Sequence, residues 1–153
     1  MQQRLLLALA LGLLAAKGSL AGGASDLAGH WRTDRYGALV QITDCGDGTP
    51  CGRLTWLDPR VTQGTTHDVR NGDPGQRGRA LLGLPILWGF ASGKDGWRDG
   101  RLYNPADGMT FRAHLGLLSS SALRVTGCLG PLCRSEVWTR AAGETAAADR
   151  TSP

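Results

Sequence analysis

Three polar residues of one loop, Asp68, Asn71 and Arg79, are the best candidates for a chemical site in this 153-residue chain. An arginine guanidinium can bind a carboxylate or phosphate through two parallel hydrogen bonds, so Arg79 is suited to hold the acidic group of a ligand. The same residues also suit a structural role: Asn71 precedes Gly72 as a tight turn requires, Asp68 can cap a helical turn, and Arg79 can pair with Asp68. The loop is therefore either a polar rim for a ligand or a stabilised turn.

The other polar residues give little support for catalysis or metal binding. The chain has no Gly-x-Ser-x-Gly motif, and its histidines, His30, His67 and His114, lack the spacing of metal ligands. We therefore assign no catalytic residue, no metal and no cofactor. An enzyme that uses the 68–79 loop is kept as a third hypothesis, behind two non-enzymatic ones.

The four cysteines form two close pairs, Cys45 with Cys51 and Cys128 with Cys133. Each pair encloses a turn, and in an oxidising compartment this pattern predicts two local disulfides. The alternative is a four-thiolate zinc site, in which paired cysteines are typically separated by two to four residues. Four cysteines allow three pairings, so the sequence alone leaves the connectivity open.

Residues 1–21 predict a cleaved signal peptide. Arg4 precedes an apolar run over residues 5–16, and residues 19–21 fit the small-x-small cleavage rule. The run is too short for a bilayer, which requires about 20 apolar residues. We expect a mature chain that begins near Gly22, does not span a membrane, and is periplasmic or secreted.

The charge of the chain gives no indication of a nucleic-acid partner. There are 17 Lys and Arg against 13 Asp and Glu, and two of the basic residues, Arg4 and Lys17, lie in the expected signal peptide. The small excess that remains is scattered and forms no basic stripe, so nucleic acid is excluded as the expected partner.

Between the cysteine pairs and around them, apolar and polar residues alternate with the period of a half-buried strand. The alternation is clear over 53–56, 111–117 and 122–126, and turn residues lie between such segments. Short strands joined by such turns predict an antiparallel sandwich or barrel. Residues 61–79 predict a long polar loop with one helical turn. The apolar run 81–90, which contains a proline, predicts a short helix or turn followed by a strand.

Taken in order along the chain, the motifs resemble those of the bacterial domain-of-unknown-function family 2147. The members of this family are small exported proteins with a lipocalin-like barrel. The resemblance runs from Gly29 to Arg140. It rests on Gly29-x-Trp31, Cys45, Cys51-Gly52, Asp68-x-x-Asn71, Arg79-x-Leu81-Leu82-Gly83-Leu84, Gly96-Trp97, Tyr103-Asn104-Pro105-x-Asp107-Gly108, Gly127-Cys128 and Trp138-Thr139-Arg140.

The resemblance implies an all-β fold: a single antiparallel, up-and-down, lipocalin- or calycin-like barrel of about eight strands over residues 22–140. Residues 141–153 are Ala-rich and polar without a pattern, and this composition predicts a disordered tail. In such barrels an arginine of the last strand packs across a tryptophan of the first. Structural roles are therefore implied for Gly29, Trp31, Trp138 and Arg140.

For function, the first hypothesis is a barrel that binds a small lipid-like or aromatic ligand, because eight strands enclose either packed side chains or one small molecule. Trp56, Trp88 and Tyr103 join Asp68, Asn71 and Arg79 as candidate ligand contacts. The apolar positions expected to line the interior are Leu54, Trp56, Leu82, Ile86, Trp88, Phe111, Leu115 and Val125. The second hypothesis is a filled barrel that binds or inhibits an envelope protein through its loops.

Overall fold

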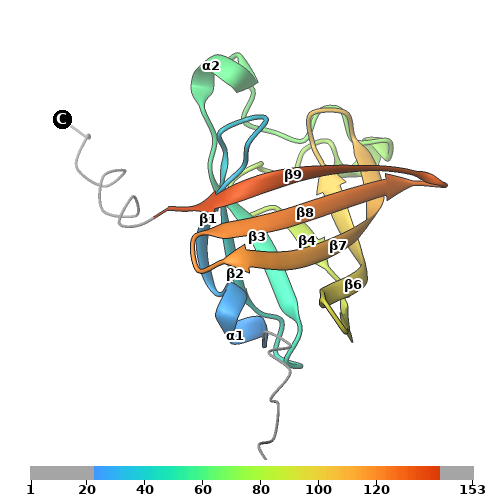
Figure 1. Cartoon of the computed structure of the whole chain (residues 1–153). Helices are drawn as coiled ribbons and strands as arrows, with labels where there is room; N and C mark the ends of the chain where they lie inside the picture. The colour runs from blue at the N-terminus through green and yellow to red at the C-terminus, as the bar shows by residue number, and fades with distance from the viewer. Residues whose placement is uncertain (1–22, 142–153) are drawn as a thin grey trace, which may run out of the picture.

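One antiparallel sheet curls into a closed barrel in the computed structural model, which describes residues 23–141 (Figure 1). The sheet order is β4-β3-β2-β1-β9-β8-β7-β6-β5, and a further pairing of β4 with β6 closes an eight-stranded ring. The ninth strand, β5, pairs only with β6. The strands are β1 (Gly29–Arg32), β2 (Leu39–Asp44), β3 (Pro50–Trp56), β4 (Pro85–Trp88), β5 (Ala91–Gly93), β6 (Gly96–Asn104), β7 (Met109–Ser119), β8 (Ala122–Leu129) and β9 (Leu132–Arg140).

The predicted all-β, antiparallel barrel of about eight strands is therefore confirmed. The alternation that predicted the strands produces the inner face: on β7, Ala113 and Leu115 are buried while Arg112 is exposed. On β8, Leu123 and Val125 are buried and Arg124 is exposed. Each strand thus contributes one apolar face to the interior and one polar face to water, as an antiparallel barrel requires.

The two ends of the barrel differ. The chain enters at one end with helix α1 (Ala24–Leu27), and the turn between the two cysteines of the first pair and the β7–β8 turn lie at this same end. The opposite end carries the β1–β2 loop (33–38), the long β3–β4 loop (57–84) and the β6–β7 and β8–β9 turns. We call the first the closed end and the second the mouth.

Side chains close the first end. Trp31 is fully buried and its indole N–H donates to the Leu27 carbonyl of α1 at 2.8 Å. The Arg140 guanidinium lies 4.2 Å from the centre of the Trp31 ring and donates to the carbonyls of Asp26, Ala28 and Ser120. Gly29 leaves room for this, because an added Cβ would lie 2.8 Å from the Arg140 guanidinium. The end is thus sealed by one aromatic–cation stack and four hydrogen bonds.

The β3–β4 loop contains two short helical segments, α2 (Pro59–Thr62) and the 3₁₀ helix η1 (Pro74–Gln76). Both begin with a proline that follows a capping aspartate, Asp58 and Asp73, whose side chains accept backbone N–H bonds. This is the standard start of a helix. The apolar run 81–90 forms a turn and then β4, whose first residue is Pro85, a position where the missing N–H is tolerated.

Both disulfides are present, Cys45–Cys51 and Cys128–Cys133, so the predicted local pairing is confirmed. The first closes the β2–β3 hairpin and the second the β8–β9 hairpin. The expected signal peptide and nearly all of the expected tail lie outside the described residues. Ala141 is described, and its N–H donates to the His30 carbonyl at 2.9 Å.

Candidate functional site

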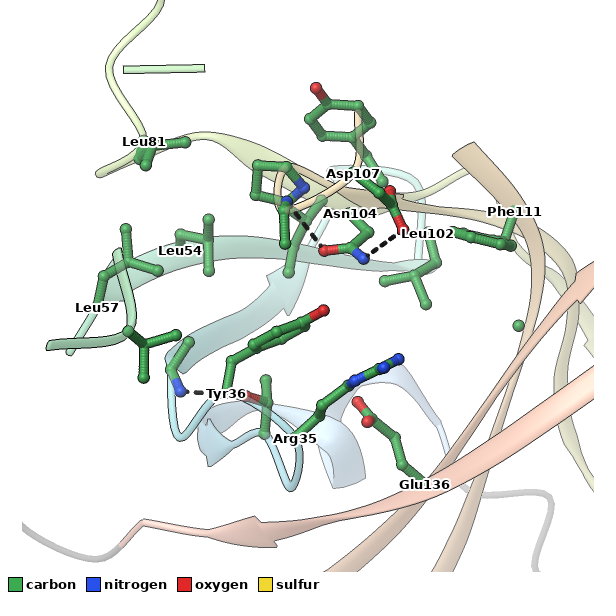
Figure 2. Close-up of a pocket in the computed structure, with 18 of the residues that line it drawn as sticks. Arg35, Tyr36, Leu54, Leu57, Leu81, Leu102, Asn104, Asp107, Phe111 and Glu136 are labelled. Carbon is green, nitrogen blue, oxygen red and sulfur yellow. Dashed lines mark hydrogen bonds between the residues drawn. The ribbon is translucent and has the colours of Figure 1, made fainter. Parts of the chain in front are cut away.

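A cavity of about 640 Å³ occupies the mouth half of the barrel (Figure 2). Its size falls within the roughly 300–1,000 Å³ of small-molecule sites in proteins. The wall is mainly apolar and is contributed by the inner faces of most strands and by the β3–β4 loop. These wall residues are Ala38, Leu54, Leu81, Ile86, Leu102, Phe111, Val125 and Trp138.

The other half of the barrel is packed with side chains. Trp31, Val40, Ile42, Leu115 and Leu123 are buried to 2% exposure or less and do not line the cavity. They form the floor on which a bound molecule would rest. The barrel is thus filled at its closed end and hollow toward its mouth.

Two tryptophans that were expected in the interior are elsewhere. Trp56 pairs with Leu39 while Leu54 pairs with Val40, and this β-bulge removes Trp56 from the face that Leu54 occupies. Trp88 pairs with Arg101 and is 37% exposed, because Leu87, which pairs with Leu102, takes the inward position. Neither tryptophan lines the cavity.

Of the other positions expected to line the interior, Leu82 is exposed, because it lies in the turn before β4, and Leu115 is buried in the floor. The remaining expected positions, Leu54, Ile86, Phe111 and Val125, do line the cavity. Alternation therefore located the wall positions Phe111 of β7 and Val125 of β8.

The polar residues of the β3–β4 loop form a compact network around Asp68. Its carboxylate is completely buried and accepts from the Tyr103 hydroxyl at 2.6 Å, from the Arg79 guanidinium at 2.7 Å and from the Asn71 amide at 2.8 Å. The Asn71 amide also donates to the Tyr103 hydroxyl at 2.9 Å. The network joins the β3–β4 loop to β6. A second contact joins this loop to the β6–β7 turn, where Gly108 packs so closely on the Arg70 carbonyl that a Cβ added to Gly108 would collide with that carbonyl.

The electrostatics of this network favour one protonation state. Burial raises the pKa of Asp68, but the hydrogen bonds from Tyr103, Arg79 and Asn71 outweigh it and hold that pKa below its ordinary value. Burial, together with the hydrogen bond to Asp68 and its negative charge, raises the pKa of Tyr103 to about 12. At neutral pH the site is therefore a carboxylate held by a neutral phenol, an amide and a guanidinium.

The network leaves little free chemistry for a ligand. Of the six candidate ligand contacts, only Tyr103 lines the cavity, whereas Asp68, Asn71 and Arg79 lie beside it and bind one another. Contact between any of the six and a ligand stays a prediction. The arrangement corresponds to the structural alternative considered for the loop, with one partner, Tyr103, that comes from a distant strand.

Other polar side chains reach the cavity, and sequence reasoning missed them. Arg35 and Tyr36 come from the β1–β2 loop, and Arg134 and Glu136 come from β9. The sequence could have indicated Arg134 and Glu136. Trp138 points inward, and the two-residue period of a strand places Glu136 and Arg134 on the same face as Trp138. The Glu136 carboxylate accepts from the Trp138 indole N–H, which fixes it against the wall.

Within residues 23–141 no group of three or more His, Cys, Asp or Glu side chains is arranged to hold a metal ion. In the same range, none of the helices has the length and apolar character needed to cross a membrane.

Two comparisons with known proteins gave matches. A family model described as an uncharacterized protein conserved in bacteria (DUF2147) matches residues 29–140. Protein HP1028 of the human pathogen Helicobacter pylori, described as belonging to the lipocalin family, has a similar structure with a TM-score of 0.67. The two are 21% identical, over 80% of this chain and 87% of that one, so the likeness concerns the fold alone. Curated proteins gave no match.

Proposed function

We propose, from the premise that this chain belongs to the bacterial DUF2147 family, that it binds a small apolar or amphipathic molecule inside its barrel. The observation that carries the proposal is the cavity of about 640 Å³ above a packed floor. A barrel of eight strands is just wide enough either to be filled by side chains or to hold one small ligand, and this interior is filled over only half its length.

The character of the wall supports the same ligand class. Apolar and aromatic side chains cover most of it, and its polar groups gather toward the mouth. An apolar body would gain about 25 cal/mol for each Å² of apolar surface removed from water. A polar end would stay at the mouth, within reach of side chains and solvent.

The two disulfides support an exported setting for this proposal. A periplasmic or secreted carrier would meet an oxidising environment, in which both disulfides persist. A filled barrel that acts only through its loops would not need the cavity, so the carrier is favoured over the interaction module.

The proposal is tested with a substitution that places a larger side chain inside the cavity. Gly127 lines it, and an added Cβ would lie 3.5 Å from Leu102 and Phe111, so a larger side chain is accommodated without a backbone clash. Wild-type protein is expected to bind the neutral apolar fluorophore N-phenyl-1-naphthylamine, and Gly127→Leu to weaken this binding by about 10-fold or more.

The matched control is Thr126→Leu at the neighbouring residue of β8, which does not line the cavity. It should bind as wild type does, and both variants should keep the circular dichroism of the barrel. Native mass spectrometry of gently purified protein should show a retained small molecule. An absence of binding by wild type, with no retained mass, would leave the interaction module as the better hypothesis.

A further inference from the structure

Most arginines of this protein are already engaged. Among the arginines within residues 23–141, only Arg35, Arg124 and Arg134 have neither a hydrogen-bond acceptor nor a carboxylate within ion-pair distance. Two of these three, Arg35 and Arg134, line the cavity. The third lies on the outer face of β8. Two of the three unengaged arginines therefore lie at the mouth.

The fold places both arginines on the lining of the same cavity. Arg35 lies in the β1–β2 loop and Arg134 lies near the start of β9, a strand that pairs with β1 at Trp31–Arg140 and Arg32–Thr139. Arg35 and Tyr36 point into the cavity together with Glu136 (Figure 2). Within residues 23–141 the Tyr36 hydroxyl has no hydrogen-bond partner. The Arg35 guanidinium lies 5.6 Å from the centre of the Tyr36 ring.

Acceptors at the mouth are mostly occupied. Asp58 binds the Arg60 side chain with both carboxylate oxygens. Asp107 accepts from the Asn104 amide and the Met109 N–H, again with both oxygens. Glu136 has one oxygen engaged by Trp138. A ligand that enters this cavity thus meets two free guanidinium groups and a free hydroxyl, but few free acceptors.

We propose that the ligand carries an acidic head group, a carboxylate or a phosphate, which Arg35 and Arg134 bind at the mouth while its apolar body fills the cavity. Guanidinium groups form short, charge-assisted hydrogen bonds with both kinds of oxyanion. The Tyr36 hydroxyl supplies a further donor. This inference rests on the proposed binding function and moves the anchor away from Arg79, which is paired with Asp68.

The experiment compares an acid with its neutral derivative. Wild-type protein is titrated with the fluorescent polyene cis-parinaric acid and with its methyl ester, which has the same apolar body but no charge. We expect the acid to bind about 10-fold more tightly. Arg35→Gln and Arg134→Gln should each reduce acid binding by a factor of about 10 and leave ester binding unchanged.

The matched control is Arg124→Gln, which removes an equally unengaged arginine from the outer face and should leave both affinities unchanged. Displacement of the probe by a fatty acid and by lysophosphatidic acid identifies the head group, because the stronger competitor has the preferred acid. A neutral monoacylglycerol should compete poorly.

Two results would overturn the inference in different ways. If ester and monoacylglycerol bind as tightly as the acid, and the variants behave like Arg124→Gln, the acidic head is wrong and the carrier function stands. If neither the acid, the ester nor the neutral fluorophore binds, both proposals fail together.

Discussion

At the scale of single residues, the central polar group is the Asp68 carboxylate, around which the polar network of the β3–β4 loop is built. This carboxylate is fully buried, and each of its three side-chain partners donates a hydrogen bond to it. A buried charge without partners would cost several kcal/mol of folding free energy. The network avoids this cost because all three partners are present. It binds the long β3–β4 loop to β6 and thereby positions one side of the mouth.

Asp68→Asn should lower the free energy of unfolding by about 1–3 kcal/mol, because the hydrogen bonds to the buried site are weakened while Arg79, which loses its charged partner, is partly exposed to water. Urea unfolding measures the effect. The control is Asp73→Asn in the same loop, an exposed cap that should cost about 1 kcal/mol or less. Equal midpoints for the two variants would show that the network is not what holds the loop.

The pH dependence of stability should have two arms that come from this network. The pKa of Tyr103 is raised to about 12, so its contribution is complete below its unfolded value of about 10 and is lost as the pH rises from there to about 12. The pKa of Asp68 is lowered, so its contribution is complete above about 3.9 and is lost as the pH falls below that value.

The alkaline arm is the easier one to measure. Wild-type protein should lose more stability between pH 8 and pH 11 than Tyr103→Phe does, by on the order of 1 kcal/mol, since the phenylalanine has no proton to lose. Thermal unfolding at the two pH values gives the difference. Identical losses in the two proteins would contradict the assignment of this arm to Tyr103.

At the scale of secondary-structure elements, the closed end depends on contacts between the first and last elements of the barrel. Trp31 of β1 donates a hydrogen bond to α1, and Arg140 of β9 covers the Trp31 ring. Arg140 also donates to three carbonyls: Asp26 in α1, Ala28 just after α1, and Ser120 in the β7–β8 turn. Closure in this way removes the exposed edges that an open sheet would have.

Trp31→Ala should destabilise the protein by about 3–5 kcal/mol, because it removes a completely buried ring from the floor of the barrel. Arg140→Ala should cost less, about 1–3 kcal/mol, because its hydrogen bonds are exposed and water can replace them. Urea unfolding of both variants tests the order. If neither midpoint moves, side chains at this end do not close the barrel.

At the scale of the whole molecule, the barrel is asymmetric. One end is packed and covered by α1, and the other is hollow and surrounded by loops, with one disulfide in a hairpin at each end. A molecule can therefore enter from one side only. Both disulfides require an oxidising compartment during folding, which agrees with the proposed export of the chain.

If the chain is exported, the mature protein should lack the signal peptide and contain both disulfides. Full-length chain expressed in a bacterium should be recovered from the periplasm or medium with an N-terminus near Gly22, as N-terminal sequencing would show. Peptide mapping without reduction should find Cys45–Cys51 and Cys128–Cys133. A retained N-terminus together with free thiols would contradict both export and the disulfide assignment.

The sequence by itself determined the features that arise from near neighbours along the chain. Strands 111–117 and 122–126 follow from two-residue alternation, and the two disulfides follow from short spacings across turns. The polar loop with a helical turn follows from its composition and prolines. These features depend on local periodicity and turn chemistry, which a single sequence contains.

Only the tertiary structure decided what lies inside. A bulge in the pairing of β2 with β3 moved Trp56 off the inner face, and no local pattern predicts where the partner strand shifts its register. Asp68 found Tyr103 across 35 positions of sequence, and Arg35 and Arg134 line one cavity although they lie in the first loop and the last strand of the barrel. The cavity exists because of how eight strands close around side chains of particular volume, and closure and packing are properties of the whole barrel.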